Sequence, residues 1–581
     1  MSKTAQIGDV VADMIRTVLV VVVTGFIFGV IMALVSSAFV QGVECLTNLR
    51  SGIDLLRFEL AGLNVDISVF FGLFIAAALV LLVRRWFGIT RWHGPADSIH
   101  AAHRTDNELD VKSGLGSTLA AFISAGGGAS IGQYGPLVHF GATIGSLIRR
   151  KTGGILSTDI FIGCGVAGAI SAGFDTPIAG IIFAHEAILR HFSLRAIAPI
   201  AIASITAAWV RDRIFDGAPL FLIDSSVADT GTLLPAALIA GPFFGLLAVT
   251  FMLAVRYSAA LAKATQWSPP MLIAIATLIM GLIATFVPET LGFGMGAMQQ
   301  MLDGAFSGGY LALILIAKLV ATALCIGFGF FGGMFSPALF VGMAAGSLGA
   351  RLVGSLGFAV AAPGMAICGM AAVGSAVIGA PIAGVLIILE MTMSYEFAMA
   401  AMLAVVTSNL VSHLIFGHSF FDRQLLDRGI DVSRGRGHLE MMEMPVSGIL
   451  SADYISVRPD ATVGDVIDIM VGKEPTNVSG SSYAEAYIIR ADGEFIGKVS
   501  LTELLKKPKL GQASDHALYE CISIKHDASL QQATEIASGF VGESIPVIDR
   551  DRNCLIGVVS EGDILQQYLR LHSRIRDLEQ A

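Results

Sequence analysis

Two short segments combine glycines that permit close backbone approach with a proline suited to the first turn of a helix. The first is Gly132-Gln133-Tyr134-Gly135-Pro136, and the second, 201 positions further on, is Gly333-Met334-Phe335-Ser336-Pro337. Proline costs little at the start of a helix, because the N–H that it lacks would have no partner there. Each segment therefore predicts a helix whose first N–H groups and partial positive charge face a cavity. That chemistry suits a small anion.

A second pair of segments extends this internal repeat. Pro177-Ile178-Ala179-Gly180 recurs as Pro381-Ile382-Ala383-Gly384, and Glu186 and Glu390 follow at equal distances. The apolar region thus divides into two related halves, about 17–212 and 233–430. Interrupted helices in matching positions of two inverted halves indicate a substrate site near the middle of a bilayer. The alternative is that these glycines only allow close packing between membrane helices.

The composition is that of a membrane protein. Hydrophobic residues make up 54% of the 581 residues and charged residues 14%, and the mean hydropathy is +0.73. Several apolar runs reach the roughly 20 residues that cross about 30 Å of hydrocarbon. Residues 1–16 are expected to form an N-terminal cytoplasmic or interfacial segment before a transmembrane domain over 17–430. The six cysteines are scattered without a C-x-x-C pair, so neither a disulfide framework nor a metal site is predicted.

Near residue 430 the sequence becomes polar, and it then repeats itself. Ile455-Ser456-Val457 returns as Ile522-Ser523-Ile524, within two runs that each predict strand, helix, strand, strand, helix. We expect a linker over 431–443, one copy over 444–508, with an insert at 474–483, and a second over 516–572. The pair resembles tandem CBS (cystathionine-β-synthase) domains, which implies a possible adenine nucleotide but no required cofactor. The contacts that the resemblance implies are Ile545, Val547, Ser560 and Asp563.

The membrane part resembles the CLC family of chloride channels and proton-coupled chloride transporters. Its G-x-E-G-P loop is similar to residues 132–136, and its G-x-F-x-P loop to residues 333–337. The resemblance implies an all-α membrane fold of broken, tilted helices in two inverted halves, followed here by the α/β tandem CBS domain. It also implies a homodimer in a lipid bilayer with one pore per subunit, and voltage-gated chloride channel activity. The anion and pore residues that it implies are those of the two loops, with Gly94 and Phe421.

The departures from the family pattern concern the proton chemistry. The family's gating glutamate, which also carries protons, is Tyr134 in this chain. Because a phenol has an ordinary pKa near 10, Tyr134 is expected to stay neutral and to act as a gate, either blocking the pore with its ring or donating its O–H to an anion. The second proton glutamate of the F-x-x-E-E pattern is replaced by Ala187. Glu186 has a mirror partner in Glu390, which favours helix capping or an ion pair, and His185 is a weak substitute proton carrier.

The hydroxyl groups that normally face the anion in this family are also missing. The G-S-G-I-P signature falls on His93-Gly94-Pro95-Ala96-Asp97, and the pore tyrosine falls on Phe421. Backbone N–H groups then remain as donors, and chloride, nitrate, bicarbonate and other small anions all stay open. Asp97 would be costly beside an anion unless it is paired or turned away.

These features favour passive transport of chloride or a similar monovalent anion. A proton-coupled antiporter with a substituted proton route stays open, as do a CBS-gated cation channel and a non-conducting sensor. A cation pore needs rings of carboxylates or carbonyl oxygens, whereas the membrane part of this chain has few acidic residues, chiefly Asp97, Asp175, Glu186 and Glu390. No Walker, H-E-x-x-H or G-x-S-x-G motif indicates an enzyme, and no nucleic acid partner is expected. Arg84, Arg85 and Arg91, together with the polar tail, favour cytoplasmic termini in a bacterial plasma membrane.

Overall fold

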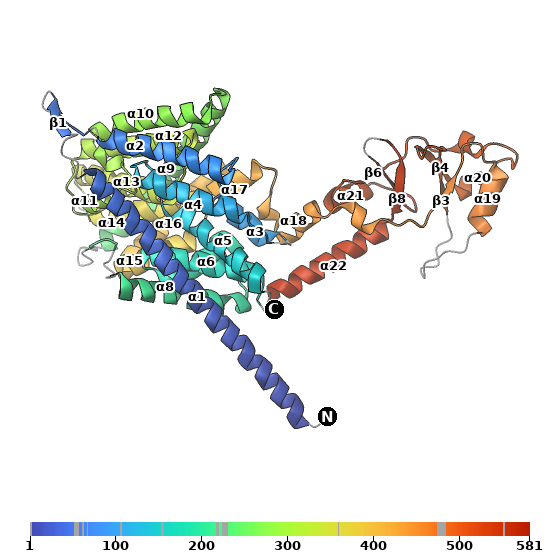
Figure 1. Ribbon diagram of the computed structural model, residues 1–581, viewed down its shortest axis with the longest axis horizontal. Coiled ribbons are helices and arrows are strands. Elements are labelled where there is room, and N and C mark those ends of the chain that lie inside the picture. The colour runs from blue at the N-terminus through green and yellow to red at the C-terminus, as the bar shows by residue number, and fades with distance from the viewer. Residues whose placement is uncertain are drawn as a thin grey trace. The chain divides into compact units, whose positions relative to one another are not determined.

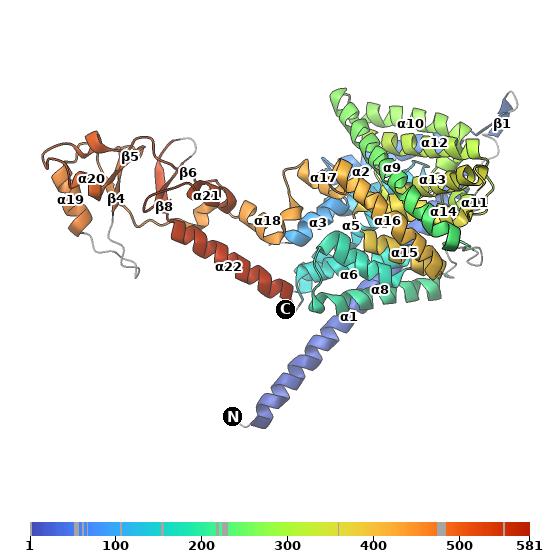
Figure 2. The same ribbon diagram turned by 180° about the vertical axis from the view of Figure 1, so that it is seen from behind.

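A computed structural model describes most of the chain as two compact units, residues 1–431 and 432–581. The described residues are 3–51, 57–60, 63–66, 68–104, 107–152, 156–215, 220–223, 230–357, 360–472, 484–549 and 552–580. The predicted insert at 474–483 lies outside them. Each unit is a separate body, and Figures 1 and 2 show the elements of each from opposite sides.

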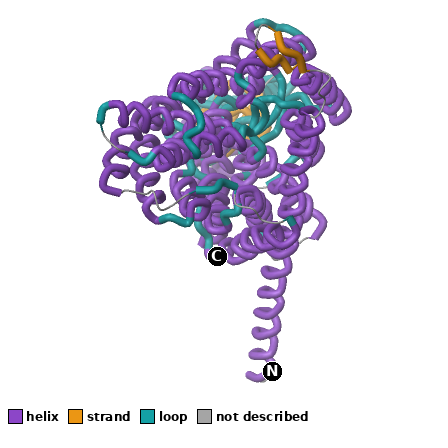
Figure 3. Tube along the Cα trace, turned by 90° about the vertical axis from the view of Figure 1, so that its left-hand side faces the viewer, coloured by secondary structure: helices purple, strands orange, loops and turns teal. Residues whose placement is uncertain are grey.

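The first unit is built almost entirely of helices, and Figure 3 shows them throughout it. Eight of the described helices are long and apolar enough to cross a bilayer. Its helices are α1 Lys3–Ser51, α2 Ser68–Phe87, α3 Pro95–His103, α4 Val111–Gly126, α5 Tyr134–Thr152, α6 Thr158–Phe174, α7 Pro177–Phe183, the π-helical η2 Ala184–Leu189, α8 Leu194–Ile214, α9 Thr230–Ala264, α10 Pro269–Phe286, α11 Met295–Leu302, α12 Gly308–Phe328, α13 Phe335–Ser355, α14 Ala362–Ile378, α15 Pro381–Thr392, α16 Tyr395–Phe416 and α17 Phe420–Leu426. One short hairpin, β1 Arg57–Leu60 with β2 Leu63–Asp66, follows α1.

The N-terminal segment is helical. Helix α1 runs from Lys3 to Ser51 without a break, so one helix holds both the segment expected at residues 1–16 and the first span. Residues 3–51 contain no proline to interrupt the backbone hydrogen bonds. The N-terminal part of α1 extends past the other helices (Figure 1), and most of residues 11–20 are exposed.

Matching helices of the two halves pack in matching ways. Helix α5 packs on α6, and α13 packs on α14. A Cβ atom on Gly145 would lie 2.5 Å from the Phe161 carbonyl oxygen, so α5 and α6 approach closely only because this position is glycine. Gly346 faces the Met365 backbone in the same way in the second half. Close helix packing therefore explains these glycines, which follow the two motif loops.

The second unit contains two small α/β repeats, as the sequence predicts. In each repeat the first strand is parallel to the second, and the second is antiparallel to the third. The strands are β3 Ile455–Val457, β4 Glu485–Ile489, β5 Phe495–Ser500, β6 Ile524–Lys525, β7 Ile545–Ile548 and β8 Leu555–Val559. The helices are α18 Arg436–Glu443, α19 Val463–Gly472, α20 Leu501–Leu504, α21 Leu530–Ala537 and α22 Glu561–Gln580. Each repeat buries its own apolar core.

Candidate anion site

The two glycine-rich loops meet in the middle of the first unit. The N–H of Gly132 donates to the carbonyl oxygen of Gly333 at 2.7 Å, and the N–H of Gly333 donates to that of Gly132 at 2.6 Å. A Cβ atom on Gly132 would lie 2.8 Å from the Gly333 oxygen, and one on Gly333 would lie 2.7 Å from the Gly135 nitrogen. Side chains would force the loops apart. The glycines thus let two segments from opposite halves join backbone to backbone.

Two helices begin directly after this junction. Helix α5 starts at Tyr134 and α13 starts at Phe335. The first backbone bonds of these helices are donated by Leu137 and Ala338. Within the described residues, the N–H groups of Tyr134, Gly135, Phe335 and Ser336 therefore have no backbone acceptor. Two helix N-termini with free donors and partial positive charge meet at one place.

A cavity of about 480 Å³ opens beside the junction. It brings together residues from both halves that the sequence assigns to the pore, namely Gly94, Gly135, Pro136, Gly333, Met334 and Phe421. Three cationic side chains also line it, Arg256, Lys263 and Arg428. Two carboxylates line it as well, and Asp427 pairs with Arg256 and Asp97 with Arg428, each at 2.8 Å. Phe421 supplies no hydroxyl, and Gly94 supplies only backbone, so the donors available to an anion here are N–H groups and cations. Gly132, Gln133, Tyr134, Phe335 and Ser336 lie behind the cavity wall rather than among its lining residues.

The Tyr134 ring fills the space between three helices. It stacks on Phe174 at the end of α6, with ring centroids 3.7 Å apart and planes at 15°, and it meets Phe335 edge-on at 5.9 Å. Only 2% of Tyr134 is exposed. Its hydroxyl donates to the Gly173 carbonyl oxygen at 3.2 Å. The tyrosine is therefore held in place by the protein, and its O–H is not directed at an anion in this conformation.

Two polar side chains of the motif loops each bury an oxygen atom without a partner. Gln133 and Ser336 are each 2% exposed, and neither Gln133 Oε1 nor Ser336 Oγ makes a hydrogen bond among the described residues. A buried polar atom without a partner costs free energy, which is a feature of sites that accept a ligand. Both atoms lie within the two loops that the sequence assigns to the anion.

The carboxylate beside Ala187 belongs to a helix cap. Ala187 is buried. The neighbouring Glu186 accepts the N–H groups of Ile382 and Ala383 at the start of α15, at 3.0 and 2.8 Å. Glu390 does the same for Ile178 and Ala179 at the start of α7, at 2.9 and 2.7 Å. Each glutamate thus caps the matching helix of the other half, which is the structural role that their mirror placement indicates.

His185 lies two residues before Ala187 and is buried. Its ring stacks on Phe192, with centroids 5.0 Å apart, and its Nδ1 lies 2.8 Å from the His191 carbonyl oxygen. Its Nε2 has no partner within the described part of the chain. The side chain is fixed mainly by packing.

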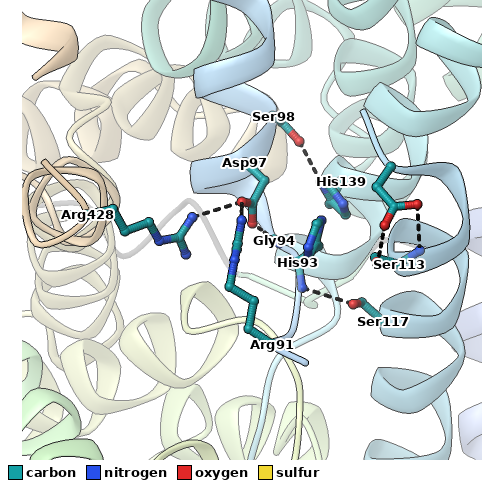
Figure 4. A network of polar contacts seen from close by, with 10 residues as sticks. Arg91, His93, Gly94, Asp97, Ser98, Ser113, Ser117, His139 and Arg428 are labelled. Atoms are coloured by element: carbon teal, nitrogen blue, oxygen red, sulfur yellow. Dashed lines mark hydrogen bonds and ion pairs between the residues drawn. The ribbon is translucent and has the colours of Figure 1, made fainter. Parts of the chain in front are cut away.

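Asp97 is paired with two arginines, which offsets the free-energy cost expected of a carboxylate beside an anion site. Arg91 and Arg428 donate to its Oδ1 at 2.7 and 2.8 Å, and the Gly94 N–H donates to its Oδ2 at 2.9 Å. Figure 4 shows the two guanidinium groups approaching Asp97 from different sides. The carboxylate also caps α3, whose N-terminus begins at the cavity wall. Sequence spacing gave no sign of Arg428, which lies 331 positions away.

The comparisons with known proteins decide the family. Residues 71–413 match the family described as "Voltage gated chloride channel", and residues 446–509 and 514–570 match the CBS domain. The chain belongs to the voltage-gated chloride channel (CLC) family. The ClC-type chloride channel ClcB of Shigella flexneri is 28% identical over 391 residues, which cover 65% of this chain and 88% of that protein. The predicted membrane fold of inverted halves with a C-terminal CBS pair is thereby confirmed.

Solved CLC structures share the fold. A slow cyanobacterial Cl⁻/H⁺ antiporter aligns with a TM-score of 0.61 and 20% identity, over 70% of this chain and 97% of the antiporter. A eukaryotic CLC transporter aligns with a TM-score of 0.60 and 20% identity, over 94% of this chain and 98% of that one. This CLC chain is therefore an integral, multi-pass membrane protein.

The predicted nucleotide contacts lie in the second CBS repeat. Ile545 and Val547 are buried in β7. Ser560 Oγ donates to Asp563 Oδ2 at 2.6 Å, and the Asp563 N–H donates to Ser560 Oγ at 3.1 Å, so the pair caps the start of α22.

Phe174 was not among the residues singled out from the sequence. It makes the closest ring contact with Tyr134, and it ends α6 immediately before Asp175, which has a left-handed backbone with φ of 59°. The matching position in the second half is Ile378, followed by Gly379 with φ of 80°. The repeat could have indicated that residue 174 ends a buried helix, but not that it faces Tyr134.

Proposed function

We propose that this CLC protein transports chloride or a similar small monovalent anion passively, with the Tyr134 ring as its gate. The observation that carries the proposal is the placement of Tyr134, whose ring packs between Phe174 and Phe335 where α5, α6 and α13 meet. A neutral phenol bonded to the Gly173 carbonyl can block a path sterically, but it does not exchange protons with the cavity as a carboxylate would.

Three further features support passive transport. Ala187 cannot bind a proton. Glu186, next to it, uses both carboxylate oxygens to cap α15. The cavity beside the helix N-termini is lined by Arg256, Lys263 and Arg428 and by two carboxylates, Asp97 and Asp427. Its cations therefore outnumber its carboxylates by one, and a net positive charge favours anions.

The alternative function is that of a proton-coupled antiporter, and two observations are consistent with it. The cyanobacterial structure with the same fold is described as a Cl⁻/H⁺ antiporter, and His185 Nε2 lacks a partner among the described residues. In that case protons would pass along His185 instead of a glutamate. The two functions differ in one measurable respect, because only an antiporter moves protons against their gradient when chloride flows.

The experiment uses liposomes that contain the purified full-length protein and a chloride gradient. Chloride efflux and internal pH are followed together, with and without a potassium ionophore as the electrical shunt. A passive transporter requires the shunt and moves no protons uphill. Both functions move net charge and therefore need the shunt, so uphill proton movement with the shunt present, abolished by His185→Gln, would replace the passive proposal with the antiporter. Nitrate and bicarbonate gradients then identify which anion is preferred.

We further propose a homodimer in a bacterial plasma membrane with both termini in the cytoplasm, and an adenine nucleotide as the ligand of the CBS pair. Cross-linking in native membranes and protease access to the C-terminal unit from each side test the first point. Calorimetric titration with ATP, ADP and AMP tests the second. Binding that is lost in Asp563→Asn, and kept in the exposed Asp492→Asn, would support it, whereas no heat with any nucleotide would exclude it.

A further inference from the structure

The second motif loop buries a hydroxyl group that has no partner within the described part of the chain. Ser336 is 2% exposed, and its Oγ makes no hydrogen bond there. Among the residues of the two motif loops, only Tyr134 and Ser336 carry a hydroxyl, and that of Tyr134 already donates to the Gly173 carbonyl oxygen. Because a buried donor without an acceptor costs free energy, the Ser336 hydroxyl is suited to a ligand that accepts a hydrogen bond.

The Ser336 hydroxyl lies where the two loops meet. A Cβ atom on Gly132 would lie 2.9 Å from Ser336 Oγ, so the hydroxyl of one half faces the backbone of the other half. The N–H groups of Phe335 and Ser336 have no backbone acceptor among the described residues. Because a single carbon atom joins Oγ to the Ser336 backbone, the hydroxyl lies beside these N–H groups. Together they form a cluster of donors at the positive end of α13, a helix of 21 residues.

Of the two unpartnered oxygen atoms in the loops, that of Ser336 is the one that can bind an anion. A hydroxyl rotates about its C–O bond and donates to an acceptor within reach, whereas Gln133 Oε1 is itself an acceptor. Hydrogen bonds to a charged acceptor are shorter and stronger than those between neutral groups. Gly94 and Phe421, which line the cavity, offer no hydroxyl. A donor on the second loop would therefore supply what these two positions lack.

We propose that the Ser336 hydroxyl donates a hydrogen bond to the transported anion and, with the free N–H groups at the start of α13, sets the affinity of the site. The anion supplies the acceptor that the fold does not, so the hydroxyl is satisfied only when the site is occupied. Met334 lines the cavity and Phe335 contacts the Tyr134 ring, so the site lies behind the cavity wall beside the gate. The proposal rests on the proposed anion transport, but it holds equally for passive and for coupled transport.

The test measures chloride binding to the purified full-length protein, by calorimetric titration and by the rise in melting temperature that chloride produces. Ser336→Ala removes the hydroxyl and adds no atom. Its dissociation constant for chloride should rise at least about tenfold, as expected when a hydrogen bond to a charged group is lost, and chloride should raise its melting temperature less. In a chloride-free gluconate buffer Ser336→Ala should be at least as stable as the wild type, because it no longer buries a hydroxyl without a partner.

Ser347→Ala is the matched control. Ser347 lies on the same helix, is 4% exposed and also has an Oγ without a partner within the described residues, but it is about 16 Å further along α13. It should match Ser336→Ala in chloride-free stability and the wild type in chloride binding. Chloride affinity that is unchanged in Ser336→Ala, or reduced equally in both variants, would overturn this proposal and leave anion transport intact. Absence of chloride binding and of chloride flux in the wild type would instead overturn the proposed function, and this proposal with it.

Discussion

Replacing Tyr134 by alanine should release the gate, and the size of the effect follows from its contacts. The ring pairs with Phe174 and Phe335 contribute about 0.5–1.5 kcal/mol each. The hydrogen bond to Gly173 contributes about 0.5–1.5 kcal/mol more. Together these contacts favour the closed position of the Tyr134 ring by about 1.5–4.5 kcal/mol. The net preference is smaller, because the ring also makes contacts in its open position. Because about 1.4 kcal/mol is a factor of ten, Tyr134→Ala should raise anion flux about 10- to 100-fold.

Tyr134→Phe separates the two contributions. It keeps both ring contacts and loses only the bond to Gly173, so flux should rise about 2- to 10-fold. The assay is chloride efflux from liposomes with a potassium shunt, normalised to the amount of folded protein. Phe174→Leu loosens the stack without altering the motif and should fall between the wild type and Tyr134→Ala. The reasoning is refuted if Tyr134→Phe equals the wild type while Tyr134→Ala is slower, since the ring would then support the pore instead of closing it.

Three other predictions concern stability. Gly333→Ala should lower the free energy of unfolding by about 1–3 kcal/mol, because its Cβ would lie 2.7 Å from the Gly135 nitrogen. Gly349→Ala, in open space on α13, which follows this loop, should leave the melting temperature unchanged or higher. Asp97→Asn should cost about 1–3 kcal/mol and speed hydrogen exchange in α3, because two guanidinium groups lose their carboxylate. Burial raises the pKa of Glu440, although Arg436 lies 3.5 Å from its carboxylate. Ionisation of Glu440 therefore destabilises the C-terminal unit as the pH rises. Glu440→Gln should slow hydrogen exchange in this unit near pH ~7.5 but not near pH ~4.

The family, the division into two halves and the CBS repeats could be predicted from the sequence because each rests on residue type and spacing. The glycine and proline positions in the two loops indicated helix starts, and α5 and α13 begin within those loops. The equal placement of Glu186 and Glu390 pointed to capping. The sequence did not show that each glutamate caps a helix in the opposite half, because that depends on how the halves interlock.

The N-terminal helix and the charge pairs show the limits of local patterns. A change from polar to apolar residues suggested a boundary near residue 16, but helical hydrogen bonding continues through it, since the backbone bonds do not depend on side-chain polarity. The partners of Asp97 come from residues 91 and 428. No spacing rule connects such positions, and their contact exists only after the chain has folded.

The sequence alone indicated a CLC membrane protein and, by resemblance to the family motifs, placed Tyr134 and Ala187 where proton glutamates are expected, because identity at a motif position is a property of the chain itself. Tertiary structure alone decided what surrounds these residues. It packs the Tyr134 ring between Phe174 and Phe335, turns its hydroxyl to Gly173, and brings the Ser336 hydroxyl beside Gly132. These arrangements depend on distances between segments far apart in the chain, which are fixed by the packing of helices and not by the order of residues.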